Sequence, residues 1–438
     1  MAAMWTRLLL ALVVVLLLAG TGFVMWAWEP AMALTTPPDA SSFDPELKER
    51  GAELARIGNC NVCHAGRNKA FAGGRALPTP FGTIYATNIT PDPETGIGRW
   101  SEAAFARAMR EGVDQQGRHL YPAFPYDHFT KLTDDDVKAL YAFLMTREGV
   151  RAETPANELP FPLNIRLTVA GWKLLFFRQG RFNPDAARDE AWNRGAYLAE
   201  AVGHCGACHT PRNSLGAEEK HRAFAGGSSE GWHAPALNAQ SPAPVPWSAD
   251  SLFVYLRSGF EPLHAAAAGP MMPVVRNLEQ VPEEDVRAIA LYVASTIGPP
   301  TPERQQKADE LIAKLNRSSR ETVGLGSAGG EGRSAVFAGA CAPCHSETRT
   351  RGAAGAVNLA LSTAVNLPDP RNAIRIVLDG SDPGAGRRGP SMPGFADVLT
   401  DAQVVELLKY ARARFTTLPA WSDLEARVRR IREGKDQS

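Results

Sequence analysis

Apolar residues are arranged in two ways along this chain: one long uninterrupted run near the start, and short amphipathic patterns after it. Residues 8–28 are uncharged and mostly aliphatic. A helix of that length, rising about 1.5 Å per residue, spans a hydrocarbon core of about 30 Å. Arg7 precedes the run and the next basic residue is Lys48, so the positive-inside rule puts the short N-terminus in the cytoplasm. We expect residues 1–30 to be a transmembrane anchor and the rest of the chain to be exported.

The same run has a second interpretation, as a cleaved signal peptide. Residues 31–33, Ala-Met-Ala, offer a small-x-small cleavage site. However, the run is longer than the apolar region of a typical signal peptide. Trp5, Trp26 and Trp28 also flank it as an interfacial aromatic belt does. These features favour the uncleaved anchor, and both interpretations export everything after residue 30.

After a spacer that contains Pro and Thr, a set of helical patterns recurs three times in the same order. Each set begins with a short pattern and ends with a longer amphipathic one, at residues 50–55 and 132–144, 194–199 and 281–295, and 335–340 and 399–415. Between them lies a helix that closes on Gly112, Gly259 or Gly380, a common residue at helix C-termini. Unrelated segments would not share this order, so we predict an all-α fold with three tandem helical domains.

The segments between the repeats set the predicted domain boundaries. They are residues 1–30 (anchor), 43–150 (first repeat), 151–186 (connecting segment), 187–300 (second repeat), 301–332 (linker), 333–418 (third repeat) and 419–438 (charged tail). The connecting segment is too apolar for a disordered linker, and we expect it to pack between domains or on a partner. The linker predicts a charged helix at residues 303–320 followed by Gly/Ser-rich sequence. A G-x-G-x-x-G match at residues 324–329 has no strand before it and is not a nucleotide-binding loop.

Composition limits the partners that the chain can have. Lys+Arg and Asp+Glu both number 47, so the formal net charge is zero. Because there is no basic field along the chain, nucleic acid is not an expected partner. A chain of 438 residues with 44% hydrophobic content is long enough to bury several cores.

The six cysteines fall into three copies of C-x-x-C-H, the attachment motif of c-type haem. Two thiols three positions apart can add to the two vinyl groups of one porphyrin, and the adjacent histidine then lies beneath the iron as its proximal ligand. We therefore predict three covalent haem c groups in three cytochrome c-type domains. The attachment residues are Cys60, Cys63, Cys205, Cys208, Cys341 and Cys344, and the proximal ligands are His64, His209 and His345.

Other uses of these cysteines fit less well. Structural zinc needs four ligands per site and no fixed histidine after each pair. A thioredoxin-like redox pair would not recur three times with histidine at the same offset. Disulfides between cysteines three apart would leave the histidines unexplained. Export agrees with haem attachment, which takes place outside the cytoplasm.

Two methionines stand at matching positions in the second and third repeats. Met271 follows Gly259, and Met392 follows Gly380, by the same twelve residues, and both lie in Gly/Pro-rich loops. A thioether there is the usual sixth ligand of an electron-transfer haem and raises its potential. Methionine is elsewhere more often core filler, but the loop position argues for ligation. Met272 competes with Met271, and the twelve-residue register favours Met271.

The first repeat has no methionine at this register, because Phe124 stands twelve residues after Gly112. Two histidines lie nearby. His128 is four positions beyond Phe124, on the loop that is expected to cross the distal face, whereas His119 precedes a Tyr-Pro segment and is expected to point outward. We predict His128 as the sixth ligand of the first iron, with His119 and a five-coordinate iron left open.

Three stretches of the chain resemble a known family. They are LYPAFPY at residues 120–126, WNRGAYL at residues 192–198 and HCGACHTPRN at residues 204–213. In these the chain resembles the membrane-bound trihaem cytochrome c subunits of bacterial dehydrogenases. That family includes the cytochrome partners of quinoprotein alcohol dehydrogenases, flavin-dependent gluconate or sorbitol dehydrogenases, and molybdenum hydroxylases of the aldehyde or nicotinate type. The phenylalanine of the first stretch most resembles the molybdenum-hydroxylase branch, since the other branches usually carry methionine there.

The resemblance implies an electron-transfer subunit rather than an enzyme. Its implied partners are a catalytic dehydrogenase subunit, membrane lipid around the N-terminal helix, and quinone or a terminal oxidase as acceptor. The implied location is the bacterial inner membrane, with the haem domains on the periplasmic side. We expect a molybdenum hydroxylase that acts on aldehydes or N-heterocycles as the dehydrogenase; the alternative is a quinoprotein alcohol or flavin-dependent sugar-acid dehydrogenase.

Two functions of other classes compete with this interpretation. A multihaem peroxidase would use an open first haem, where the expected methionine is missing. A haem-based sensor would need an output domain, and none follows the haem motifs. The sequence shows no flavin, pterin or quinone-cofactor motif, so we expect substrate oxidation on another chain.

Overall fold

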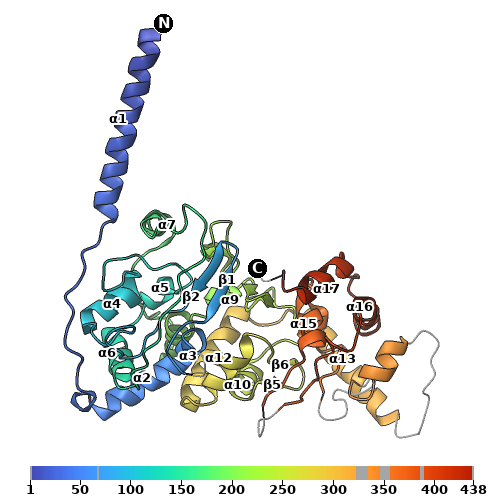
Figure 1. The fold of residues 1–438 in the computed structure, drawn as a ribbon. Coiled ribbons are helices and arrows are strands. Elements are labelled where there is room, and N and C mark those ends of the chain that lie inside the picture. The colour runs from blue at the N-terminus through green and yellow to red at the C-terminus, as the bar shows by residue number, and fades with distance from the viewer. Residues whose placement is uncertain (1, 67–68, 322–333, 346–355, 385–388, 437–438) are drawn as a thin grey trace. The chain divides into compact units, whose positions relative to one another are not determined.

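The computed structural model describes residues 2–66, 69–321, 334–345, 356–384 and 389–436 (Figure 1). Within these residues helices predominate over strands, and the chain divides into two compact units. The first consists of Met1–Ala52, Cys63–Leu77 and Phe81–Phe182, and the second of Glu53–Val62, Pro78–Pro80 and Asn183–Ser438. The Gly/Ser-rich part of the predicted linker, with its G-x-G-x-x-G match, lies outside the described residues.

The long apolar run forms helix α1 (Ala2–Ala27), which projects from the rest of the first unit (Figure 1). Among the described helices, it is the one that is long and apolar enough to cross a membrane, over Ala3–Ala27, and its most apolar window is unburied. Length and composition of this kind are shared by membrane anchors and signal sequences. The N-terminal helix is therefore a candidate for either.

The other elements as far as Phe182 are short helices and one two-stranded hairpin, of which residues 53–62 and 78–80 belong to the second unit. These are η1 (Ala40–Ser42), α2 (Pro45–Ile57), α3 (Cys60–Cys63), β1 (Ala76–Thr79), β2 (Gly82–Tyr85), α4 (Glu102–Glu111), α5 (Tyr126–Phe129), α6 (Asp134–Met145) and α7 (Thr168–Phe176). Helix α4 ends where the sequence predicts, and a serine caps its start. Ser101 Oγ accepts a hydrogen bond from the Ala104 N–H at 3.1 Å, and Gly112 closes the helix at φ +63°.

Helices α2 and α6 approach each other so closely that only glycine fits at the crossing. A Cβ at Gly51 would lie 2.0 Å from the carbonyl oxygen of Ala139. Beside the crossing, Arg50 Nε lies 3.2 Å from Asp136 Oδ1, and Asp136 is largely buried. The glycine permits the contact and the ion pair fixes its register.

The second unit contains the whole of the second and third motifs. Its elements are α8 (Glu190–Tyr197), η2 (Leu198–Val202), α9 (Gly206–His209), η3 (Lys220–Arg222), β3 (Gly227–Ser229), β4 (Trp232–Ala234), α10 (Ala249–Ser258), β5 (Phe260–Glu261), β6 (Ala265–Ala266), α11 (Met271–Leu278), α12 (Glu283–Ile297), α13 (Pro302–Glu321), η4 (Phe337–Cys341), α14 (Thr363–Asn366), α15 (Arg371–Asp379), α16 (Asp401–Phe415) and α17 (Leu424–Arg432). The charged helix predicted in the linker is confirmed as α13. Helices α8 and α12 repeat the crossing of α2 and α6, since a Cβ at Gly195 would lie 1.9 Å from Ala288 O.

Around the third motif, α15, α16 and α17 share one core. Phe337 and Cys341 are buried in it, together with residues of α15 and α16. The chain beyond residue 418, expected to be a charged tail, also contributes to this core through Trp421, Leu424, Val428 and Ile431. Three of these residues recur at the i, i+4 and i+7 spacing of one helix face, so α17 packs its apolar stripe inward despite its many charges.

The all-α prediction missed three short hairpins, β1–β2, β3–β4 and β5–β6. Their strands are only two to four residues long. A strand that short cannot show the alternation of apolar and polar positions by which strands are recognised in a sequence.

Candidate functional site

The histidine of each C-x-x-C-H motif is oriented by one backbone carbonyl group. The Nδ1···O distances are 2.6 Å from His64 to Thr87, 2.7 Å from His209 to Pro235 and 3.1 Å from His345 to Val357. A carbonyl oxygen can only accept, so the hydrogen lies on Nδ1 and the lone pair remains on Nε2. This tautomer and this fixed ring are what a metal-ligating imidazole requires.

Burial keeps all three imidazoles neutral. The pKa of His64, of His209 and of His345 lies below the usual value, chiefly because the surrounding protein removes water from the charged form. The hydrogen bond to the carbonyl group works in the opposite direction and is the smaller effect. A neutral ring is the form that binds a metal.

Burial favours the neutral thiol at three of the six cysteines. Burial raises the pKa of Cys205 to about 12 and that of Cys341 to about 11, and it also raises the pKa of Cys208. Zinc binding and thiol redox catalysis both require the thiolate. Among the described residues, no cysteine lies in a cluster of three potential metal ligands. The thiols therefore fit covalent attachment better than either alternative.

The second and third motifs fold as a helical turn that places cysteine and histidine on one side. The His209 N–H donates to Cys205 O at 3.1 Å, and the His345 N–H donates to Cys341 O at 2.8 Å. Residues four apart on a helix lie on the same face. The first thiol and the imidazole of such a motif can therefore face the same porphyrin. The residues present fit a covalently attached haem.

A repeated phrase, Phe-Ala-Gly-Gly at residues 71–74 and 224–227, anchors the first two histidines through the main chain. The Gly73 N–H donates to His64 O at 3.0 Å, and the Gly226 N–H donates to His209 O at 2.9 Å. The first residue of each phrase, Phe71 or Phe224, has a positive φ. In both repeats, the Phe-Ala-Gly-Gly phrase is therefore a loop that binds the motif histidine through the same kind of backbone hydrogen bond.

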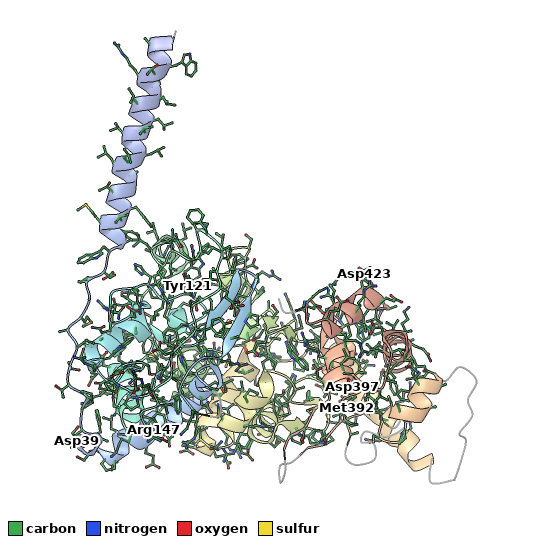
Figure 2. All side chains as sticks on the ribbon, in the orientation of Figure 1. Asp39, Tyr121, Arg147, Met392, Asp397 and Asp423 are labelled. Carbon is green, nitrogen blue, oxygen red and sulfur yellow. The ribbon has the colours of Figure 1, made fainter. Side chains whose placement is uncertain are left out.

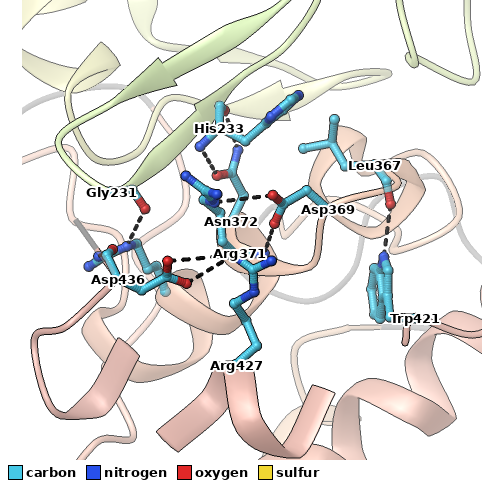
Figure 3. A network of polar contacts seen from close by, with 10 residues as sticks. Gly231, His233, Leu367, Asp369, Arg371, Asn372, Trp421, Arg427 and Asp436 are labelled. Carbon is cyan, nitrogen blue, oxygen red and sulfur yellow. Dashed lines mark hydrogen bonds and ion pairs between the residues drawn. The ribbon is translucent and has the colours of Figure 1, made fainter. Parts of the chain in front are cut away.

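The carbonyl group that holds His209 follows the hairpin β3–β4. Figure 3 shows this hairpin bound by residues of the third repeat. Asn372 on α15 exchanges two hydrogen bonds of 2.8 Å with the main chain of His233 on β4. Arg375, one helical turn further along α15, donates to Gly231 O at 2.7 Å and to Asp436 O at 2.8 Å. Pro235 comes two residues after His233, so α15 fixes the backbone that orients this imidazole.

The loops after α4 and α10 have the same register. The Leu120 N–H donates to Gly112 O at 2.7 Å, and the Ala267 N–H donates to Gly259 O at 2.7 Å. Four residues after these donors stand Phe124 and Met271. Identical loop closure supports the alignment of these two positions, which the sequence could make only by counting from the glycines.

The prediction that Met271 lies in a loop is wrong, because helix α11 begins at Met271 and includes Met272. These two methionines and Met392 differ in their surroundings. Met272 lines a small cleft together with Ser381 and Pro390, whereas Met271 does not line it. Met392, labelled in Figure 2, packs against the core that contains Cys341. Its main chain is fixed by two hydrogen bonds to Ser381, of 2.7 and 2.9 Å. Met392 and one thiol of the third motif therefore belong to one core.

Two family models match the chain around the first and third motifs. The family model of cytochrome c matches residues 48–148, and that of cytochrome c oxidase, cbb3-type, subunit III matches residues 330–410. The fructose dehydrogenase cytochrome subunit of Gluconobacter japonicus is 35% identical over 98% of this chain and 89% of its own length. The chain belongs to the family of cytochrome c subunits of dehydrogenases.

Two other relatives of this cytochrome differ in how much of them it covers. The gluconate 2-dehydrogenase cytochrome c subunit of Pantoea cypripedii is 37% identical over 84% of the chain and 85% of its own length. A subunit of nicotinate dehydrogenase from Pseudomonas putida is 46% identical over 92% of the chain, which spans only 33% of that longer protein. The cytochrome c domains imply covalently bound haem c.

The prediction that His119 points outward is wrong. Its ring is buried, with Nε2 lying 2.7 Å from Ala27 O and Nδ1 lying 3.1 Å from Lys173 Nζ. Burial lowers the pKa of His119, which keeps the ring neutral: Nε2–H donates to the carbonyl group and Nδ1 accepts from the lysine. With both nitrogens engaged, His119 cannot coordinate iron unless these bonds break. Lys173 is 54 residues away from His119 in the chain, so the local sequence around His119 does not predict the contact.

The predicted ligand of the first iron, His128, lies on the one-turn helix α5 and is buried. The ring of Phe124 packs against that of Phe129, with 5.3 Å between the ring centroids. Phe124 is thereby accounted for as a packing residue, and the ligation by His128 remains a prediction.

Sequence reasoning missed the groups that orient the proximal histidines. These are backbone carbonyl groups of Thr87, Pro235 and Val357. Every residue has a carbonyl group, so no residue type marks these positions. The one available signal was the Phe-Ala-Gly-Gly phrase, which marks the loop that precedes the acceptors in the first two repeats.

Proposed function

We propose that this cytochrome is an electron-transfer subunit with three covalent haems, which accepts electrons from a separate dehydrogenase and delivers them to membrane quinone or a terminal oxidase. The observation that carries the proposal is the shared geometry of the three motif histidines, each with Nδ1 bound to a carbonyl group and Nε2 left for iron. The relatives named as cytochrome subunits of fructose and gluconate dehydrogenases support the role.

The side chains around each iron position decide what a bound haem can do. Haem c supplies reversible one-electron chemistry. His64, His209 and His345 hold the proximal side, and we propose Met271 and Met392 for the distal side of the second and third sites. A filled sixth position excludes substrate, so the chain carries electrons while oxidation of the substrate takes place on the partner.

The number of haems is the first test. The two matching family models cover the first and third motifs, and a relative named a dihaem cytochrome c-type protein aligns with 63% of this chain. Three haems per chain are expected from the pyridine haemochrome assay on the purified full-length protein. Changing both Cys205 and Cys208 to alanine should leave two, whereas the exposed Leu215→Ala should leave three. A count of two or fewer in the wild type would contradict the proposal.

The distal methionines are tested by potential rather than by haem content. Removing a thioether ligand should lower the potential of that haem, because methionine ligation raises it. We expect this from Met271→Ala and from Met392→Ala, with Met272→Ala as the matched control for the first. The partner's own activity with an artificial acceptor should survive in each variant. If Met272→Ala, and not Met271→Ala, shifts the titration, the assignment of the second ligand is reversed.

The first haem is tested by its spin state. We propose His128 as its sixth ligand, which predicts a low-spin iron with a lower potential than the two His/Met haems. Low-temperature EPR of the full-length protein should show that low-spin signal convert to high spin in His128→Ala. A low-spin signal that persists unchanged in the variant would exclude His128. A high-spin signal in the wild type would favour the peroxidase alternative, in which this haem is open.

For the partner, we infer a molybdenum hydroxylase that acts on aldehydes or N-heterocycles. The nicotinate dehydrogenase relative supports this branch, whereas the alcohol and gluconate dehydrogenase relatives keep the quinoprotein and flavin alternatives in view. Purification through a tag on this cytochrome should bring down a chain that contains molybdopterin. A chain that carries a flavin or a quinone cofactor would reassign the branch.

For location, we propose that α1 is an uncleaved anchor in the inner membrane, with the haem domains on the periplasmic side. The protein should then stay with membranes after alkaline carbonate washing. N-terminal sequencing should find the start of α1 intact. A mature N-terminus after Ala33 would show that α1 is a signal sequence.

A further inference from the structure

Apart from α1 and the residues just after it, the exposed apolar residues of the described chain are concentrated in one short stretch. Phe161, Leu163, Ile165, Leu174 and Leu175 are all exposed, the first of them by 79%. The remaining large exposed apolar residues, Leu215, Val254, Val398 and Leu418, are scattered singly, as is normal on a soluble surface. Residues 161–175 therefore form a surface that needs an explanation.

Helix α7, within this stretch, has two distinct faces. Val169, Ala170 and Lys173 are buried against the first unit. Leu174 and Leu175 are exposed by 58% and 61%. The outward face of the helix therefore carries two large apolar side chains that are mostly exposed.

The outward face meets the N-terminal helix. A Cβ at Gly171 would lie 3.7 Å from the ring of Phe23 on α1. Gly171, Leu174 and Leu175 stand at i, i+3 and i+4, so they share one side of α7. The two exposed leucines therefore flank the point at which α7 touches α1.

This contact lies near the C-terminal end of α1. Phe23 precedes the end of α1 at Ala27 by four residues, or about 6 Å at 1.5 Å per residue. Amphipathic helices that lie in a membrane interface bury their apolar faces by about 5–10 Å. If α1 spans the bilayer, α7 lies at the depth of such a helix.

A set of hydrogen bonds fixes the segment at this level. Lys173 Nζ donates to Glu111 O at 2.6 Å and to Gly112 O at 2.8 Å, and it reaches His119 Nδ1, whose other nitrogen binds the end of α1. Just before α7, Arg166 donates to His119 O at 3.0 Å. Helix α7, the loop that follows α4 and the end of α1 are therefore joined through one buried histidine.

The charge of the segment suits the same surroundings. Residues 161–181 contain no Asp or Glu, and besides the buried Lys173 they include Arg166, Arg178 and Arg181. Tyr121, labelled in Figure 2, adds an amphipathic ring that donates its hydroxyl hydrogen to Leu163 O at 2.8 Å. Apolar side chains with basic and aromatic neighbours are typical of segments at an interface with anionic lipid.

We propose that residues 161–175, with α7 at their centre, are a second membrane contact that lies in the outer interface of the bilayer beside α1. The occupant of the exposed apolar face is lipid. This inference rests on the proposed anchoring role of α1, and it adds that the first unit is held flat against the membrane instead of moving freely on a tether. The loop ahead of Phe124, which shares His119 with this segment, then faces the membrane.

The test is photocrosslinking to lipid in the full-length protein with its haems attached. A benzophenone amino acid is placed at Leu174, at Val15 within α1, or at Leu215, whose exposure of 53% nearly matches that of Leu174. Each variant is reconstituted in nanodiscs of phosphatidylethanolamine and phosphatidylglycerol, and its haem content is checked against the wild type. Lipid adducts are then located by mass spectrometry of the peptides.

Lipid adducts are expected at Val15 and Leu174 and not at Leu215. Adducts at Val15 without adducts at Leu174 would overturn the proposal while the anchor stands, as would crosslinking of Leu174 to a protein partner. Equal yields at Leu174 and Leu215 would overturn it as well. Absence of adducts at Val15 would show that the anchor itself is wrong.

A second variant separates insertion from mere proximity. With the benzophenone at Ile165, the double substitution Leu174→Glu and Leu175→Glu should remove most of the lipid adduct at residue 165, because charged side chains resist burial in the interface. With the benzophenone at Val15, the same double substitution should leave the adduct unchanged. Persistence of the Ile165 adduct in the charged variant would count against α7 as the contact.

Discussion

In the first two repeats, the residue before the motif has a left-handed backbone conformation, whereas the third motif continues directly from a π-helical turn. Asn59 and His204, the residues before Cys60 and Cys205, have φ values of +52° and +39°. In the third repeat the turn η4 includes Cys341 itself. All three motif histidines nevertheless bind a carbonyl group through Nδ1. The motif thus requires a local helical turn and one acceptor, and it tolerates different routes into that turn.

The packing behind the motif differs in the same way. In the first two repeats, Gly51 and Gly195 let two helices touch through their backbones. In the third, the ring of Phe337 packs 4.9 Å from that of Tyr410 and 5.7 Å from that of Phe415, and α17 completes the core. A different family model matches the third repeat, which agrees with this change of scaffold.

The largest expected effect comes from removing the aromatic centre of the third core. Phe337 is fully buried, and replacing such a residue with alanine costs about 3–5 kcal/mol. Phe337→Ala should therefore accelerate hydrogen exchange of the α16 amides in the full-length protein and leave α6 protected. The half-buried Phe415→Ala is the control and should cost less. If α6 and α16 were to lose protection together, the third core would not be a separate unit of stability.

The next effect tests the close helix crossing. A Cβ at Gly195 would approach a backbone oxygen to 1.9 Å, so Gly195→Ala must separate α8 from α12 and should lower the free energy of unfolding by about 3 kcal/mol, at the upper end for overpacking. Gly339 in η4 has no atom within 4 Å of its Cβ position. Gly339→Ala should therefore stabilise by up to about 1 kcal/mol. Urea denaturation of both variants measures the contrast, and equal losses would refute it.

These contrasts show which parts of the structure a sequence can reveal. The repeated helices, their caps at Ser101 and Gly112, and the motifs follow from local pattern, because caps and amphipathic faces are properties of neighbouring residues. The apolar stripe of α17 was also present, but its many charges led only to the prediction of a charged tail. The burial of His119 depends on Lys173 and Ala27, which are far away in the chain, and no local pattern encodes that contact.

A smaller effect is expected from the ion pairs beside the two helix crossings at Gly51 and Gly195. Arg194 binds Asp285 with two hydrogen bonds of 2.8 and 2.9 Å, whereas the corresponding bonds from Arg50 to Asp136 measure 3.2 and 3.5 Å. Shorter, bidentate pairs are the stronger ones. A double-mutant cycle with Arg→Met and Asp→Asn should give a coupling of about 1–2 kcal/mol for the second pair and less for the first. A larger coupling in the first repeat would reverse the comparison.

The smallest effect concerns how α17 is attached. Lys409 Nζ lies 2.5 Å from Glu425 Oε1, but both side chains are more than half exposed. The hydrogen bond from Lys409 lowers the pKa of Glu425 below its usual value near 4.5. Because the folded pKa lies below the unfolded one, the contribution is present above pH 4.5 and is lost as the pH falls through the folded pKa. Salt should screen it, because both partners face solvent.

Glu425→Gln should therefore change the urea midpoint of α17 unfolding only slightly at neutral pH and low salt. The difference from the wild type should vanish at high salt and at a pH below the folded pKa. Val428→Ala, which removes a fully buried side chain of the same helix, should destabilise α17 far more and at every salt concentration, since cavity formation does not depend on charge. If the two variants had equal effects, charge rather than the apolar stripe would hold α17, and the third core would end near residue 418 after all.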